Sequence, residues 1–98
     1  MKSKKIRDSA RMAPCQVREV GICNGNPETV VFAHVNGGGM GMKNSDLFGA
    51  YACSSCHSWL DGGYIGLGHD RAYRDLSHLE AVMRTQKILL NLGYVTIS

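Results

Sequence analysis

The chain has 98 residues, which is enough for one small domain and too few for a separate cofactor-binding domain. Hydrophobic residues make up 44% of it and charged residues 19%, a composition typical of globular and not of disordered proteins. No apolar run approaches the ~18 residues of a transmembrane helix, and the basic N-terminus lacks the apolar centre of a secretory signal. The sequence therefore predicts a soluble cytoplasmic protein that is a minimal enzyme, a binding module or a subunit.

The formal net charge of +3 is concentrated at the N-terminus. Five of the eleven basic residues lie in the first eleven positions, where Asp8 is the one acidic side chain. These five are Lys2, Lys4, Lys5, Arg7 and Arg11. A basic arm over residues 1–14 can pair with phosphates and release their counterions, which makes the last four of these side chains candidate DNA contacts. A solvated, frayed terminus is the alternative.

Four cysteines occur in two pairs, Cys15 with Cys23 and Cys53 with Cys56. The C-x-x-C spacing of the second pair lets two thiolates reach one metal ion, and Gly21 permits a sharp turn beside the wider first pair. Four thiolates fit a structural, tetrahedral Zn²⁺ site, which would stabilise a domain with a small core. A redox-active C-x-x-C pair and ordinary buried cysteines are the alternatives.

Two β-type segments are expected on either side of a glycine-rich loop. Residues 29–35 are rich in β-branched and aromatic side chains and are bounded by turn residues. Residues 36–45 contain four glycines, which predicts a loop. Residues 47–52 are apolar again and are expected to approach the second cysteine pair as a strand or an extended segment.

A short helix is expected to begin near Cys56, capped by Ser54 or Ser55, and to stop at the glycines of 62–63. Trp59 on this helix is expected to pack in the core against the longer helix that follows. The organisation predicted is one domain over residues 1–98. It consists of a basic arm over 1–14, a cysteine-bearing core over 15–62, and a connection with a packing helix over 63–98.

The longer helix is predicted over residues 71–92, with Asp70 as its N-cap and Gly93 just beyond its C-terminal end. Its apolar residues recur mostly at steps of three and four, which predicts a core-packing face. They are Ala72, Leu76, Leu79, Val82, Met83, Leu89, Leu90 and Leu92. His69 and His78 are expected at the surface.

The candidate catalytic residues cluster around the loop and the short helix. His34 ends the first β-type segment, and Asn44 and Asp46 follow the glycines. His57 and Asp61 are four residues apart on the short helix, so they share a face and can bind one divalent ion. An unligated His34 could then accept a proton from water.

The order of these features resembles that of the HNH, or ββα-metal, nucleases. Their pattern is an apolar strand ending in His, a loop with Asn, and C-x-x-C-H at the start of a helix. It matches here at Phe32–His34, at 43–47 and at Cys53–His57. Over most of its length the chain also resembles the family of small lambdoid phage and prophage nucleases typified by YbcO. The stretches that carry this resemblance are 15–18, 23–29, 33–34, 46–47, 52–57 and 84–86.

The resemblance implies an α+β, zinc-stapled treble-clef (ββα-metal) domain with a long C-terminal helix. It implies metal-dependent hydrolysis of DNA phosphodiester bonds in phage DNA recombination or processing, in the cytoplasm of the host cell. His34 corresponds to the general base, and His57 and Asp61 correspond to ligands of a catalytic Mg²⁺, Mn²⁺ or Zn²⁺. Asn44 or Asp46 would orient the base or complete the metal site.

Two positions depart from the motif. Ala33 stands where the family often has a metal-binding His or Asp, and Phe48 stands where the middle Asn is usual. The alternative is therefore a non-catalytic, zinc-stapled module that binds DNA or protein. A nuclease of this size that cuts both strands is expected to act as a homodimer.

Overall fold

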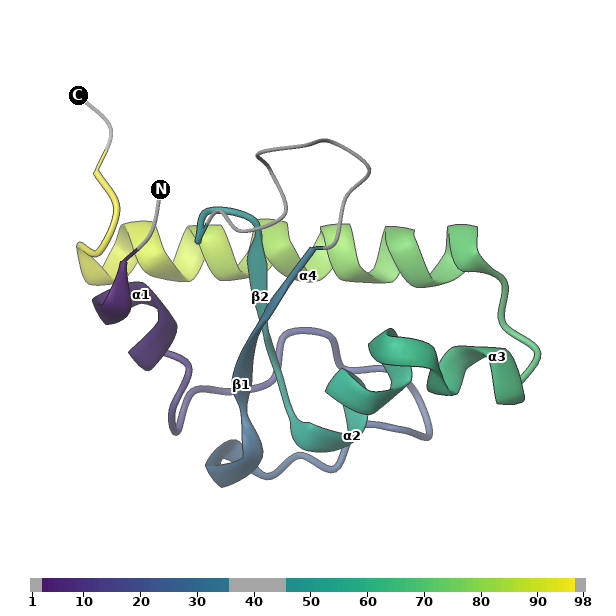
Figure 1. Ribbon diagram of the computed structural model, residues 1–98. Helices are drawn as coiled ribbons and strands as arrows, with labels where there is room; N and C mark the ends of the chain where they lie inside the picture. The colour runs from purple at the N-terminus through teal and green to yellow at the C-terminus, as the bar shows by residue number, and fades with distance from the viewer. Residues whose placement is uncertain (1–2, 36–45, 97–98) are drawn as a thin grey trace.

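A computed structural model of the chain describes residues 3–35 and 46–96 (Figure 1). It is a small α+β structure with a two-stranded sheet and a long C-terminal helix. The helices and strands in chain order are α1 (Lys4–Asp8), a 3-10 turn (Pro27–Thr29), β1 (Val31–His34), β2 (Gly49–Ala52), α2 (Ser54–Ser58), a π-type turn (Trp59–Gly63), α3 (Tyr64–Gly66) and α4 (Arg71–Leu92). No helix in the described residues is long and apolar enough to cross a membrane.

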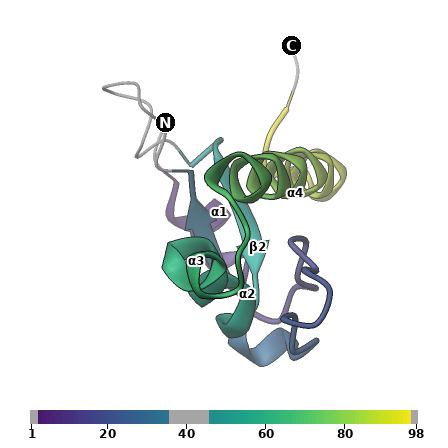
Figure 2. The ribbon, with the colours of Figure 1, turned by 90° about the vertical axis from the view of Figure 1, so that its right-hand side faces the viewer.

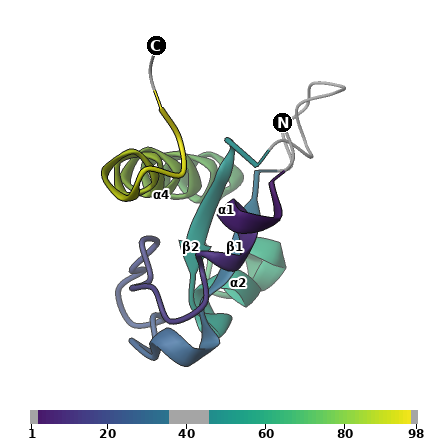
Figure 3. The same cartoon turned by 90° about the vertical axis from the view of Figure 1, so that its left-hand side faces the viewer.

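The two predicted β-type segments form an antiparallel hairpin, although each strand is shorter than expected. Val31 lies opposite Ala52, and His34 lies opposite Gly49. Helix α4 covers one side of the hairpin and α1 lies on the other side (Figures 2 and 3). The Ser3 backbone N–H bonds to Asp46, which contacts His34, so the end of β1 that carries His34 is next to the start of α1.

The two faces of the hairpin differ in the size of their side chains. The face towards α1 carries Phe32 and Tyr51, whose hydroxyl lies 2.7 Å from Oγ of Ser9 just beyond α1. Because side chains alternate along a strand, the face towards α4 carries Ala33, Ala50 and Ala52, all at most 3% exposed. These small side chains let α4 approach the backbone of the sheet closely.

Two polar residues of α4 use this close approach. Oγ1 of Thr85 accepts a hydrogen bond from the backbone N–H of Tyr51 at 3.1 Å. Nε2 of His78 donates to the carbonyl oxygen of Ala33 at 2.9 Å. His78 is 7% exposed, so the expectation that it lies at the surface is wrong.

The limits of α4 are confirmed, but the face that packs is not the predicted one. The Asp70 carboxylate accepts from the backbone N–H of Tyr73, and Gly93 has the left-handed φ of 82° that ends the helix. The buried residues of α4 are His78, Ala81, Val82, Thr85 and Leu89. Of the eight apolar residues assigned to the core, Val82 and Leu89 are buried and the other six are exposed, because the alanine face of the hairpin accommodates small side chains.

The basic N-terminal segment contains a helix that the sequence analysis did not predict. The Ser3 hydroxyl caps α1 by accepting from the backbone N–H of Ile6, whose side chain is fully buried. Ala10 is also buried. These apolar contacts hold residues 4–8 against the hairpin, so this part of the segment is not frayed.

Helix α2 begins directly after Cys53, the residue that follows β2, and Cys53 is its N-cap. Sγ of Cys53 accepts from the backbone N–H of Cys56 at 3.4 Å, so the predicted Ser54 or Ser55 cap is wrong. The chain turns at Gly62, which has a φ of 148°, and then continues as α3 instead of ending there. Trp59 is 2% exposed and makes an edge contact with Tyr73 of α4, which confirms its predicted core position.

The Phe32 ring leaves no room for a side chain at Gly49. A Cβ there would lie 2.1 Å from the ring. We therefore expect Gly49→Ala to lower the free energy of unfolding by roughly 1–3 kcal/mol, the usual cost of overpacking, as measured by urea denaturation. Gly66→Ala is the matched control, because a Cβ at Gly66 meets nothing within 4 Å. Equal stability of Gly49→Ala and the wild type would contradict this packing.

Candidate functional site

The four cysteines converge from three separate parts of the chain. Cys15 and Cys23 lie between α1 and β1, Cys53 follows β2, and Cys56 lies in α2. Their Sγ atoms all lie within 4.8 Å of one another, and none of the four forms a disulfide. Four sulfurs at ~2.3 Å from one tetrahedral Zn²⁺ would be about 3.8 Å apart, close to the 3.9 Å between Cys53 and Cys23. The donor set and its geometry fit a structural zinc ion.

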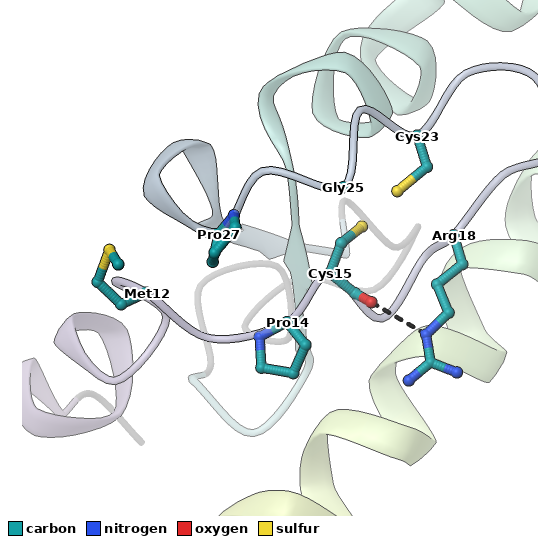
Figure 4. Close-up of a pocket in the computed structure, with 7 residues that line it drawn as sticks. All are labelled: Met12, Pro14, Cys15, Arg18, Cys23, Gly25 and Pro27. Atoms are coloured by element: carbon teal, nitrogen blue, oxygen red, sulfur yellow. Dashed lines mark hydrogen bonds between the residues drawn. The ribbon is translucent and has the colours of Figure 1, made fainter.

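The backbone between Cys15 and Cys23 turns so that both thiols face those of Cys53 and Cys56. Arg18 and Gly21 adopt left-handed φ angles of 52° and 78°, and this turn brings Cys23 back towards Cys15. Nε of Arg18 donates to the carbonyl oxygen of Cys15 at 3.1 Å, as Figure 4 shows beside an open pocket lined by both cysteines. The backbone N–H of Asn24 donates to Sγ of Cys53. The sharp turn that the sequence predicts at Gly21 is confirmed.

Without a bound cation the thiols cannot all ionise together. The hydrogen bond from Cys56 lowers the pKa of Cys15, and the same contact raises the pKa of Cys56. Burial raises the pKa of Cys23. A divalent cation would offset the repulsion between thiolates, which is the electrostatic reason for a metal at this position.

His34 forms a short hydrogen bond with a buried carboxylate. Its Nε2 lies 2.6 Å from Oδ1 of Asp46, which is 1% exposed. The other carboxylate oxygen accepts from the backbone N–H of Ser3 and lies 3.5 Å from Nε of Arg7. Burial raises the pKa of Asp46, but the contacts with His34, Ser3 and Arg7 outweigh it and lower the pKa overall.

This arrangement fixes which ring nitrogen of His34 faces Asp46. An ionised Asp46 can only accept, so Nε2 of His34 carries a hydrogen, and the tautomer that fits this contact has Nδ1 as its proton acceptor. The His34 side chain is 28% exposed and therefore accessible to water. A histidine that is oriented by a carboxylate and keeps a free ring nitrogen can act as a general base.

His57 and Asp61 also meet, as expected from their spacing. Nε2 of His57 lies 3.4 Å from Oδ2 of Asp61, and the two side chains are 42% and 60% exposed. In residues 3–35 and 46–96, the four cysteines are the one group of three or more potential metal ligands close enough for a single ion. The pairs His34–Asp46 and His57–Asp61 are thus separate, and Asn44 lies outside the described residues.

The start of the basic N-terminal segment lies next to the His34–Asp46 pair, where Arg7 contacts Asp46. Lys4, Lys5 and Arg7 are on α1 and are exposed, as is Arg11. The helix begins beside Asp46, because the Ser3 backbone N–H bonds to that carboxylate. Positive charge and a candidate base therefore occupy the same end of the hairpin.

Two residues with a role in this site were not identified from the sequence. Ser3 bonds to Asp46, and His78 bonds to the carbonyl oxygen of Ala33, the residue before His34. Arg7 was predicted as a DNA contact, but its contact with Asp46 was not predicted. Burial lowers the pKa of His78, so its neutral form is favoured. One signal for His78 was available: it lies on the same helical stripe as the buried Ala81, Val82 and Thr85.

Comparisons with known proteins match nearly the whole chain. A model of the family described as "Putative nuclease YbcO" matches residues 4–94. The protein of that name from Escherichia coli (strain K12) is 42% identical over 93 residues, which cover 92% of this chain and 95% of the relative. The protein of the same name from Enterobacteria phage 82 has the same identity and coverage.

A solved structure has the same fold. It is described as a "putative bacteriophage protein from Escherichia coli str. K-12 substr. MG1655" and is 42% identical. The two structures superpose with a TM-score of 0.75, and the match covers 91% of this chain and 100% of the other. The family model and these relatives together establish that the chain belongs to the YbcO family.

Proposed function

We propose that this protein is a metal-dependent endonuclease of the HNH type that hydrolyses DNA phosphodiester bonds. The observation that carries the proposal is the hydrogen bond between Nε2 of His34 and the buried Asp46, which leaves Nδ1 as the ring nitrogen that can accept a proton. The names of the relatives, "Putative nuclease YbcO", support the same class of activity.

In this proposal His34 removes the proton from the attacking water. Asp46 fixes the orientation of the imidazole through Nε2 and stabilises the positive charge that the ring acquires. Ser3 and Arg7 keep the Asp46 carboxylate ionised and in place. The middle-Asn role of the HNH motif would thus fall to Asp46.

His57 and Asp61 would hold the catalytic divalent ion, Mg²⁺, Mn²⁺ or Zn²⁺. The His57 imidazole and the Asp61 carboxylate face each other across one helical turn and are suitable ligands for such an ion. Both side chains are exposed, so phosphate oxygens of a substrate could reach the same ion. When bound, such an ion stabilises charge on the phosphate and on the leaving oxygen.

The cysteine cluster supports a structural zinc ion and a treble-clef arrangement. In this arrangement a cysteine-bearing loop, a hairpin and a helix share one metal through Cys15, Cys23, Cys53 and Cys56. We assign the cluster a structural role because three of its cysteines are at most 8% exposed and four protein ligands leave a tetrahedral ion no open position.

The partner proposed is DNA, and a phage recombination or processing step in the host cytoplasm is the proposed setting. Lys4, Lys5 and Arg11 would contact backbone phosphates. The exposed Arg7 guanidinium would contact a DNA phosphate while its Nε stays close to the Asp46 carboxylate. A homodimer would supply the two sites needed to cut both strands.

A non-catalytic zinc module remains the second candidate function. One observation in its favour is Ala33, whose side chain cannot bind a metal ion. In the described part of the chain, the pairs His34–Asp46 and His57–Asp61 also do not come together as ligands of one ion. Such a module would bind DNA or protein through its basic segment without a second metal ion.

Binding of a second metal ion separates the two candidates. We expect the zinc-loaded protein to bind one further Mn²⁺, followed by electron paramagnetic resonance. His57→Ala and Asp61→Ala should weaken this binding by about tenfold or more, whereas Glu28→Ala, which removes an exposed carboxylate elsewhere, should not. Failure to bind a second ion, or equal binding by all variants, would favour the non-catalytic module.

A further inference from the structure

One face of α4 carries four exposed apolar side chains that nothing in the described part of the chain covers. They are Leu76, Leu79, Met83 and Leu90, which are 57%, 51%, 69% and 39% exposed. At 3.6 residues per turn these four positions fall within about 60° of the helix circumference. We call this stripe the α4 seam. Apolar side chains gathered on one exposed face mark an interaction surface.

The spacing of the seam is that of a coiled coil. With Ala72 and Gln86 included, the positions follow one another at alternating steps of four and three residues. Gln86 is the polar position of this series, and its Nε2 donates to the Leu47 carbonyl oxygen of the same chain. This alternation is the a/d pattern by which one helix packs against another helix of the same kind. The seam therefore fits another helix. Every other copy of the protein carries the same seam on its own α4, so a second copy can supply that helix.

The charges beside the seam select the orientation of that second copy. Glu80 and Lys87 flank the seam on one edge, and Asp75 lies on the other edge. In an antiparallel pair Glu80 lies near Lys87 of the second copy, and the two-fold axis repeats the pairing. A parallel pair would place Asp75 near Glu80 of the second copy, which brings two like charges together.

We propose that the protein forms a homodimer through antiparallel packing of the α4 seam against the seam of a second copy. The hairpin face that bears His34 points to the opposite side from α4, so both candidate sites stay open in this dimer. One helix face is smaller than the usual interface of ~800 Å² per partner, so we expect a weak dimer that dissociates on dilution. The proposal does not require nuclease activity.

Sedimentation velocity over a range of protein concentrations tests this interface. We expect the wild type to pass from monomer to dimer and Met83→Glu to weaken dimerisation by about tenfold or more, because a charge would be buried in the seam. Ile65→Glu is the matched control, since Ile65 is 68% exposed on α3 and outside the seam. Thermal melts of each variant confirm that the fold is retained.

A charge exchange tests the orientation in the same experiment. Glu80→Lys and Lys87→Glu should each weaken the dimer, and the double variant should restore it, because the opposite-charge pairs are formed again. A wild type that stays monomeric at all concentrations would assign the seam to a different partner and overturn the proposal. Unchanged dimerisation in Met83→Glu, or no recovery in the double variant, would overturn it as well.

Discussion

Cys56→Ser is expected to abolish both zinc binding and the folded state. Structural zinc contributes roughly 10–16 kcal/mol of apparent binding free energy, which is comparable with the ~5–15 kcal/mol total stability of a domain. Cys56 is a fully buried residue of α2, and its side chain contacts that of Cys15 in the loop before β1. Its loss removes a ligand at the point where these segments meet. Zinc content and near-ultraviolet circular dichroism of the purified variant measure the effect.

The control for this prediction is Ser58→Ala, which changes an exposed residue of the same helix. It should bind one zinc ion per chain and melt like the wild type. Removal of zinc from the wild type with a chelator should reproduce the Cys56→Ser result. A zinc-free Cys56→Ser protein with the wild-type melting temperature would contradict the structural role. A reversible disulfide between Cys53 and Cys56 in the wild-type protein would favour the redox alternative.

His34→Ala is expected to lower the rate of DNA cleavage by about 10²–10⁴-fold, the usual contribution of a general base. The fold should be kept, because the His34 side chain is 28% exposed and packs at the edge of the hairpin. The rate is measured under single-turnover conditions, so that DNA binding and product release do not obscure the chemical step.

Two controls make this result specific. His69→Ala removes a histidine that bonds to Trp59 and lies away from the hairpin end, and it should cut DNA at nearly the wild-type rate. Added imidazole should partly restore cleavage by His34→Ala, because it can replace the missing base. Cleavage by His34→Ala at the full rate would assign the proton transfer to another group.

The limits of the helices were predictable where local chemistry sets them, but their packing was not. Asp70 and Gly93 mark the ends of α4 correctly, since a cap depends on neighbouring backbone groups. Which face of α4 is buried depends on the alanines of the hairpin opposite it. They bring the helix so close to the sheet that the small Thr85 packs there and bonds to the backbone of Tyr51. Periodicity alone therefore selects the more hydrophobic stripe, which here is the exposed one.

Helix α1 was missed for a related reason. A five-residue helix is too short to be stable alone, and its charged sequence gives no periodic signal. Its formation depends on the burial of Ile6 and on the contact between the Ser3 backbone and Asp46. Both are tertiary interactions.

The candidate site was predictable to different degrees. Cysteine spacing identified a set whose sulfurs do converge, and the i, i+4 spacing identified the contact of His57 with Asp61. The contact of His34 with Asp46 joins residues twelve positions apart and depends on the hairpin register. The sequence indicated that Asp46 is a polar residue close to His34 along the chain, but not that its carboxylate is buried against the His34 ring.

Incubation of the zinc-loaded protein with supercoiled plasmid DNA tests the proposed activity most directly. The reaction is run with Mg²⁺, with Mn²⁺ and with a chelator too weak to remove the structural zinc. We expect nicked and linear DNA with an added divalent ion and intact plasmid with the chelator. Intact plasmid under every condition, from protein that is folded and holds one zinc ion per chain, would contradict the proposed nuclease activity.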